Sequence, residues 1–135
     1  MNTKNIETII KRFENPDEVS LFEKGKFEKV ELGSMVIGRA TYEPGWKWTE
    51  HVGPNINKDY CDVEHVGMVI SGKAVASFPN GKTTVLKPGD LFFVPGEPHD
   101  SWVVGDKPYV SLHFLGAEKY TCLLYTSPSP RDTNE

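Results

Sequence analysis

The chain has 135 residues, of which 25% are charged and 38% hydrophobic, and its formal net charge at pH 7 is -4. A chain of this length suits one domain with a single hydrophobic core. The acidic balance and the lack of a local basic cluster argue against nucleic acid as a partner. No apolar run approaches the roughly 18 residues of a membrane-spanning helix, so we expect no membrane partner either.

Residues 1–26 are expected to form a short helix or an arm that precedes the main domain. Four apolar residues lie at helical spacing, namely Ile6, Ile9, Ile10 and Phe13. The Asn-Pro-Asp sequence at residues 15–17 then interrupts the pattern. No signal peptide is visible in this segment. The localisation therefore stays open, with the cytoplasm as the default and the outside of the cell as the alternative if the substrate is a polysaccharide.

From residue 27 to residue 118 the hydrophobic period changes to two, which predicts β-strands. Short runs rich in Val, Phe, Tyr, Thr and Trp alternate with turn residues, and Pro79-Asn80-Gly81 predicts a hairpin. Many short strands without strand-helix alternation predict an all-β sandwich or small barrel. We therefore assign residues 27–118 to a single β domain.

The segment after Tyr120 is rich in turn residues and has no strand pattern. Residues 122–132, CLLYTSPSPRD, look like the translation of a sequencing adapter. We therefore expect residues 121–135 to be a non-native, disordered tail, with a native disordered tail as the alternative. Without Cys122, one cysteine is left, Cys61, so no disulfide framework is expected.

Three of the four histidines lie on or beside predicted strands, namely His51, His65 and His99. Imidazole nitrogens are common metal ligands, and strands of a small barrel can bring distant residues together. We expect these three side chains to converge on one metal ion. The alternative is that they are surface or core residues without a metal.

Two of these histidines, His51 and His65, lie in a segment that resembles the first motif of the cupins, G-x5-H-x-H-x3-4-E-x6-G. Gly45, His51, His65 and Gly72 fall on its first glycine, first histidine, glutamate and last glycine, provided that the loop between them is lengthened. The chain departs from the motif where Gly53 takes the second histidine position and His65 takes the glutamate position.

A later segment resembles the second cupin motif, G-x5-P-x-G-x2-H-x3-N. Gly89, Pro95, Gly96 and His99 match it with one residue missing, and Val103 takes the asparagine position. The resemblance covers residues 27–116. It implies an all-β cupin jelly roll, also called a double-stranded β-helix barrel, here with the short N-terminal helix or arm.

Three imidazoles without a carboxylate favour copper, and zinc second, over the iron or manganese that the family's site with a glutamate would suit. We therefore expect one copper ion per chain, with zinc, iron or manganese as alternatives. His113 has no motif position, so we expect a structural role for it. Asp100 follows His99 and could either orient it or face solvent.

The alternation of side chains along a strand predicts which neighbours of the histidines face the interior of the barrel. If His65 points into the barrel, Cys61 does so too. Cys61 could then approach the metal, although a small apolar filler is the commoner role of a buried cysteine. Tyr60 lies in the long loop expected at the metal mouth and is a candidate catalytic residue. The same parity places all three tryptophans away from the metal: Trp46, Trp48 and Trp102.

Three apolar residues of the predicted strand after residue 64 also project away from the barrel, namely Val66, Met68 and Ile70. Such a patch must be covered, so we expect a homodimer interface or a contact with the N-terminal arm. An aromatic platform for sugar rings is the alternative.

The chain further resembles, more distantly, the small copper cupins that cleave cellulose oxidatively. This resemblance rests on size, on the RATYEPGWKWTEHVGP segment and on the all-histidine site. It implies that His51, His65 and His99 hold a copper that oxidises a polysaccharide with peroxide or oxygen. One alternative is a metal-dependent lyase or dioxygenase acting on a small molecule, with Tyr60 as its base. Another is a non-catalytic metal- or ligand-binding protein.

Overall fold

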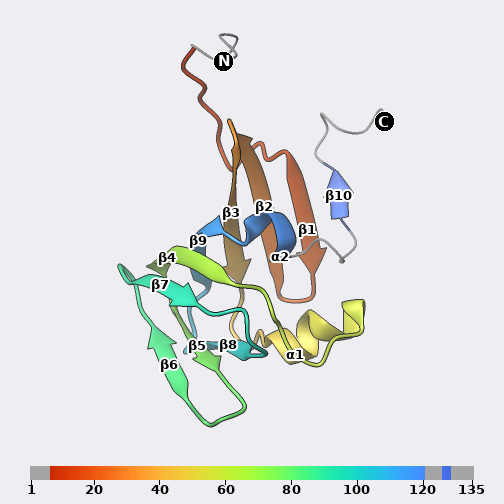
Figure 1. The fold of residues 1–135 in the computed structure, drawn as a ribbon, viewed down its shortest axis with the longest axis vertical. Helices are drawn as coiled ribbons and strands as arrows, with labels where there is room; N and C mark the ends of the chain where they lie inside the picture. The colour runs from red at the N-terminus through yellow and green to blue at the C-terminus, as the bar shows by residue number, and fades with distance from the viewer. Residues whose placement is uncertain (1–6, 121–125, 129–135) are drawn as a thin grey trace.

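The computed structural model describes residues 7–120 and 126–128. Its strands form two antiparallel sheets, one of seven strands and one of three (Figure 1). The first sheet has the order β10-β1-β2-β3-β9-β4-β7. Its strands are β10 (Thr126–Pro128), β1 (Glu18–Phe22), β2 (Gly25–Leu32), β3 (Met35–Tyr42), β9 (Tyr109–Leu115), β4 (His65–Ser71) and β7 (Leu91–Val94). The predicted all-β class is therefore confirmed.

The second sheet has the order β6-β5-β8. Its strands are β6 (Thr83–Leu86), β5 (Lys73–Ser77) and β8 (Asp100–Val104). The predicted hairpin joins β5 to β6, and Gly81 takes the positive φ of 94° that this turn needs. Side chains from both sheets form one hydrophobic core, which includes Phe27, Tyr42, Val69 and Val103.

Among the described residues, helical structure is limited to short turns between β3 and β4 and after β9. They are α1 (Trp48–His51), the 3-10 helix η2 (Gly53–Ile56) and α2 (Ala117–Tyr120). Within the described residues, no helix has both the length and the apolar character needed to cross a bilayer.

The N-terminal segment is an arm and contains no helix between residues 7 and 17. It leads away from the sheets (Figure 1), and the side chain of Ile10 is 84% exposed. Phe13 lies against the guanidinium of Arg39, 5.0 Å from its ring centre. The sheet begins at Glu18, before the boundary expected at residue 27. The sequence pattern missed β1 because this strand buries Ser20 and exposes Leu21, the reverse of the usual apolar alternation.

Part of the segment expected to be a non-native tail is described, since β10 pairs with β1 in antiparallel register, Glu18 opposite Pro128. Residues 121–125 and 129–135 lie outside the described part of the chain. The origin of this segment therefore stays a prediction.

The apolar face predicted on the outer side of β4 is present. Val66 lies opposite Phe93 and Met68 opposite Leu91, and the two β7 side chains are 60% and 76% exposed. The homodimer that this face suggested stays a prediction.

Strands β4 and β9, which carry His65 and His113, approach each other closely. Gly67 of β4 lies opposite His113 of β9, and a methyl group at Gly67 would collide with the backbone carbonyl oxygen of Leu112. A backbone group cannot move aside as a flexible side chain can, so this position requires glycine.

We expect Gly67→Ala to lower the free energy of unfolding by about 1–3 kcal/mol, because overpacking forces the two strands apart. Urea denaturation followed by circular dichroism measures this change. Val66→Ala, which shortens a half-buried neighbour on the same strand, serves as the control and should cost less. A Gly67→Ala protein as stable as the parent would contradict the close approach.

Candidate metal centre

The centre of the candidate site is a backbone bridge between two residues that lie far apart in sequence. The N–H of Cys61 donates to the carbonyl of His99, and the N–H of His99 donates to the carbonyl of Cys61, both at 2.9 Å. Directly opposed residues of an antiparallel pair project to the same face. The thiol and the imidazole therefore point into the same interior.

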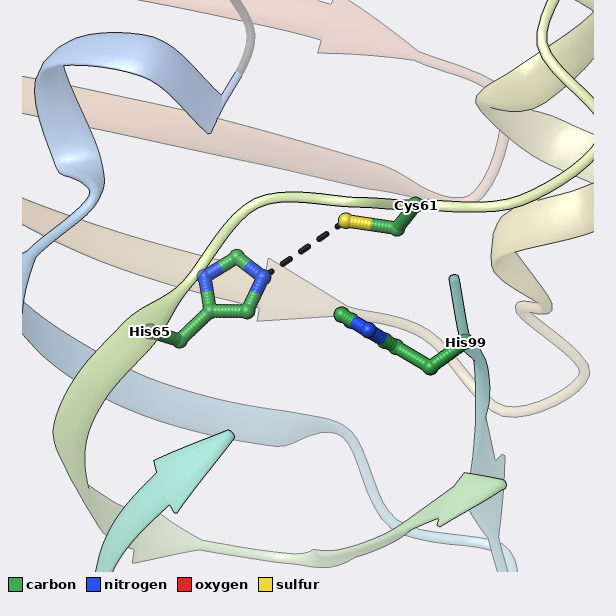
Figure 2. Close-up of side chains that lie close together, drawn as sticks. All are labelled: Cys61, His65 and His99. Carbon is green, nitrogen blue, oxygen red and sulfur yellow. Dashed lines mark hydrogen bonds between the residues drawn. The ribbon is translucent and has the colours of Figure 1, made fainter. Parts of the chain in front are cut away.

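His65 completes a cluster of three potential ligands. It is the first residue of β4, and its Nε2 lies 3.6 Å from the sulfur of Cys61. Figure 2 shows the three side chains pointing toward one another from the loop before β4, from β4 and from the segment before β8. One potential ligand atom from each side chain lies within 4.8 Å of the other two, and all three residues are buried. This arrangement can hold one metal ion.

The ring of His99 is held by a hydrogen bond on one of its nitrogens, and the other, Nε2, is the candidate for a lone pair. Its Nδ1 lies 2.8 Å from the carbonyl oxygen of Glu97. A carbonyl can only accept, so Nδ1 carries the proton and Nε2 keeps its lone pair for a ligand. Metal-binding histidines usually have such a partner on the other ring nitrogen.

The structure does not bring His51 into this cluster. His51 is the last residue of α1, and its Nδ1 accepts a hydrogen bond of 3.0 Å from the N–H of Lys47 in the same turn. The segment around it was expected to continue as a strand, and the helical turn changes the direction of its side chains. Cys61 takes the third place that was predicted for His51. Ligation by His65 and His99 stays a prediction.

A residue that lies far away in sequence caps the helical turn. Asp100 of β8 accepts hydrogen bonds from the N–H of Thr49 at 3.1 Å and from its hydroxyl at 2.9 Å. Lys47 adds an ion pair with the same carboxylate at 3.7 Å. Asp100 is 8% exposed and so does not face solvent. Its carboxylate accepts hydrogen bonds from Thr49 and Ser101, not from the His99 ring. Neither of the two roles expected for it is therefore seen. Instead it holds α1 against β8.

The tertiary structure adds His113 to the same interior. Its ring centre lies 5.4 Å from that of His65, and its Nε2 lies 3.0 Å from the hydroxyl of Ser111. The rings of Phe27 and Phe92 also pack against it. The metal-ligand cluster does not include His113. His113 thus lies beside the cluster, and the structural role expected for it stays a prediction.

Tyr60, the predicted catalytic tyrosine, is 45% exposed and does not line the interior cavity. Trp46 and Trp48 do line it, so the strand-parity expectation was wrong for both. Parity failed because Gly45 turns the chain with a φ of 92° and Trp48 begins α1. Trp102 lies outside the cavity, near the ammonium of Lys47.

The cavity itself has a volume of about 50 Å³. Its walls combine the cysteine and three histidines with aromatic and aliphatic side chains, among them Tyr42, Leu86, Phe92, Val94 and Tyr109. None of the described residues lining the cavity is an aspartate, glutamate, lysine or arginine. The interior is therefore small and largely apolar, with its nitrogen and sulfur atoms gathered at the cluster.

Burial keeps the cluster uncharged. Burial lowers the pKa of His65 well below its usual value, and the nearby His113 and His99 lower it further. Burial also lowers the pKa of His99, although its hydrogen bond to Glu97 opposes the change. Burial alone lowers the pKa of His113 to about 4 and is the main reason that the pKa of the Cys61 thiol rises to about 12. At neutral pH the imidazoles are therefore neutral and can donate their lone pairs.

A different alignment of the first cupin motif would have found Cys61. Starting the motif at Gly53 instead of Gly45 needs no lengthened loop and still ends at Gly72. Asp59 and Cys61 then take the two histidine positions, and His65 keeps the glutamate position. Asp59 is exposed, so the described cluster corresponds to the second, third and fourth ligand positions of the two motifs.

No protein-family model and no curated protein matches the chain by sequence. Solved structures match its fold. A protein of unknown function from Rhizobium leguminosarum is 18% identical with a TM-score of 0.57, and the match covers 82% of this chain and 97% of that one. The polyketide cyclase RemF from Streptomyces resistomycificus is 20% identical with a TM-score of 0.54, covering 76% and 69%.

An uncharacterised protein with a double-stranded β-helix domain from Klebsiella pneumoniae is also 20% identical, with a TM-score of 0.50 and coverage of 79% and 85%. At these identities the matches show the fold alone. The chain therefore has the cupin-like double-stranded β-helix fold.

Because the buried histidines are neutral, we expect the metal-free protein to lose stability in acid. The unfolded chain takes up protons near pH 6.5, whereas His113 in the folded protein stays neutral down to about pH 4. Between these values the unfolded state binds more protons, so the free energy of unfolding falls as the pH falls. His113 alone should account for about 3 kcal/mol between pH 7 and pH 4.

Urea denaturation of metal-free protein at a series of pH values measures this dependence. His113→Gln removes the titrating group, so its curve should be shallower over the same range, whatever its stability at pH 7. Equal slopes for the variant and the parent would show that His113 is not a buried neutral imidazole.

Proposed function

We propose that the chain is a metal-dependent protein that binds a small molecule in its cavity, next to a zinc or copper ion held by Cys61, His65 and His99. One observation carries the proposal: three buried ligand atoms, one sulfur and two nitrogens, converge within 4.8 Å of one another on the wall of the cavity. Catalysis on that small molecule is the activity that the arrangement supports best.

The donor set fits zinc and copper better than iron or manganese. Thiolate is a soft ligand that suits zinc and Cu(I), and imidazole suits zinc and copper, whereas manganese prefers oxygen donors. Three protein ligands leave a coordination position for water or substrate, as in catalytic zinc sites. The replacement of the expected His51 by Cys61 therefore makes zinc as good a candidate as copper.

A bound zinc would supply Lewis-acid chemistry and an activated water, and a bound copper would supply redox chemistry. The chain's own residues prepare the site for either metal. His99 presents Nε2 because Glu97 holds its Nδ1 proton. The apolar walls limit access of bulk water, which strengthens polar interactions with a bound molecule.

The size and burial of the site favour a small substrate over a polymer. His65 and His99 are 6% and 3% exposed, and the cavity of about 50 Å³ has room for only a few non-hydrogen atoms. A copper that oxidises crystalline cellulose needs an exposed position, because an insoluble chain cannot enter a cavity. The small-molecule alternative is therefore the better supported function, and copper-dependent oxidation of polysaccharide has less support.

Tyr60 has little support as the base of such a reaction, since it is exposed and outside the cavity. His113 and Ser111 are better placed, because they line the cavity and share a hydrogen bond of 3.0 Å beside His65. A role as a ligand-binding protein without catalysis needs only the cavity and the metal, and it is the second candidate.

We expect protein incubated with a mixture of zinc, copper, iron and manganese and then dialysed to retain about one equivalent of zinc or copper per chain. Elemental analysis measures the metal content. Cys61→Ser and His65→Ala each remove a ligand and should weaken metal binding by at least about 100-fold, more than the loss of a supporting residue costs.

His51→Ala is the matched control, because this histidine lies outside the cluster, and it should retain the parent's metal content. Retention of iron or manganese alone would contradict the ligand set. If His51→Ala lost the metal while Cys61→Ser retained it fully, the ligands would be those predicted from the sequence, with His51 in place of Cys61.

A second expectation separates the two substrate classes. Copper-loaded protein incubated with cellulose, a reductant and peroxide should release no oxidised oligosaccharides above the level of the Cys61→Ser protein, because the polymer cannot reach the buried cluster. Mass spectrometry of the soluble products measures this. Oxidised oligosaccharides that require Cys61 would support the polysaccharide function instead.

A further inference from the structure

The outward side of β9, β4 and β7 carries no polar side chain, although these strands form an antiparallel sheet. Such a sheet commonly packs one face on the core and turns polar side chains to water on the other. The inward side chains of these strands line the cavity or join the core, as expected. The outward positions are apolar as well, and the six largest side chains define what we call the outer face: Met68, Ile70, Leu91, Phe93, Leu112 and Phe114.

The outer face is open to solvent, most of all on the edge strand β7. Leu91 and Phe93 are 76% and 60% exposed, and Ile70 and Phe114 are 44% and 36% exposed. A large apolar side chain presents about 200 Å² when it is fully exposed, so these four leave roughly 400 Å² uncovered. Apolar patches of this size on a single chain are often interaction sites.

The N-terminal arm covers the neighbouring part of the same side of the sheet and stops at the border of the outer face. Arg39 of β3 lies opposite Leu112 of β9, which in turn lies opposite Met68 of β4. The guanidinium of Arg39 lies over the ring of Phe13 from the arm, and Glu14 forms an ion pair with it at 3.5 Å. The arm therefore covers the charged part of this side of the sheet and leaves the apolar part bare.

The arm also has uncovered apolar side chains of its own. Ile9 and Ile10 are 48% and 84% exposed where the arm leads away from the sheets (Figure 1). A chain advances at most about 3.6 Å per residue, so Ile10 lies within roughly 11 Å of Phe13, at the border of the outer face. Two exposed apolar features therefore lie close together, and both need cover.

We propose that a second copy of this chain covers both, in a twofold dimer in which outer face packs on outer face and each arm lies against the partner. A twofold axis brings the same surface of both copies together, so an apolar face can cover its own equal. The outer face has no charged side chain to select a partner of opposite charge, and the interfaces of permanent dimers are the more hydrophobic class.

The size of the face explains why the arm takes part. Its roughly 400 Å² is about half of the 800 Å² or so that each partner buries in an interface of standard size. The two exposed isoleucines of each arm add apolar area next to the face. This dimer is independent of the proposed metal site, which lies on the inward side of the same strands.

Sedimentation equilibrium of the full chain tests the dimer. The parent should sediment with twice the mass of one chain at micromolar concentration. Leu91→Lys and Phe93→Lys each place a charge inside the interface, where an unpaired ammonium is costly, and each should sediment as a monomer under the same conditions. Both side chains are exposed in the single chain, so circular dichroism of the two variants should match that of the parent.

Val85→Lys is the matched control for these two variants. Val85 is an apolar residue of β6, in the other sheet, and it is 50% exposed. This variant should remain a dimer. Dissociation caused by Val85→Lys but by neither Leu91→Lys nor Phe93→Lys would move the interface to the other sheet and overturn the proposal.

The combined change Ile9→Ser and Ile10→Ser tests the arm without altering the sheet. It should raise the dissociation constant of the dimer about tenfold or more, because two apolar side chains lose their burial. Arg12→Ser, a change of an exposed polar residue of the arm, is the control and should dimerise like the parent. An unchanged dissociation constant in the double isoleucine variant would overturn the contact between each arm and the partner.

A parent that sediments as a monomer at all concentrations up to about 100 µM would overturn the dimer, since that affinity is weaker than interfaces of this class provide. Co-sedimentation of such a monomer with phosphatidylcholine vesicles would identify a lipid surface as the occupant of the outer face. In neither case would the metal content change, so the proposed metal site is tested separately.

Discussion

The candidate site depends on one backbone bridge, the pair of reciprocal 2.9 Å hydrogen bonds between Cys61 and His99. This bridge joins the loop that precedes β4 to the residue that precedes β8, and it places the sulfur and the imidazole on the same face. His65 follows Cys61 by four positions along an extended chain and so returns to that face. The convergence of three potential ligands is thus a property of backbone pairing, and buried side chains pack around it.

A second constraint is the neutrality of the cavity. Its described walls contain no aspartate, glutamate, lysine or arginine, and burial keeps its histidines and its thiol uncharged at neutral pH. The charged groups nearby are used outside the cavity, where Asp100 and Lys47 fix α1. A metal ion would therefore bring the first charge into this interior, and the Cys61 thiol would have to lose its proton to hold it.

The capped turn α1 shows how long-range contacts change the local structure. The segment WKWTEHV has aromatic and β-branched residues that favour a strand. A carboxylate from β8, about 50 positions later in the chain, caps its backbone, and Gly45 turns the chain before it. Local propensity contributes less free energy than this buried hydrogen bonding and the burial of Trp48. The turn carries Trp48 into the cavity wall and His51 away from it.

The sequence by itself determined the fold class, because the period-two pattern and the turn residues from residue 27 onward are local properties. It also determined two of the three clustered residues, His65 and His99, because each lies at a fixed distance from a glycine of its motif. The third clustered residue depended on which glycine starts the first motif, Gly45 with a lengthened loop or Gly53 without one. Only the tertiary structure decided between His51 and Cys61, because the bridge to His99 forms between segments that come together when the two sheets close.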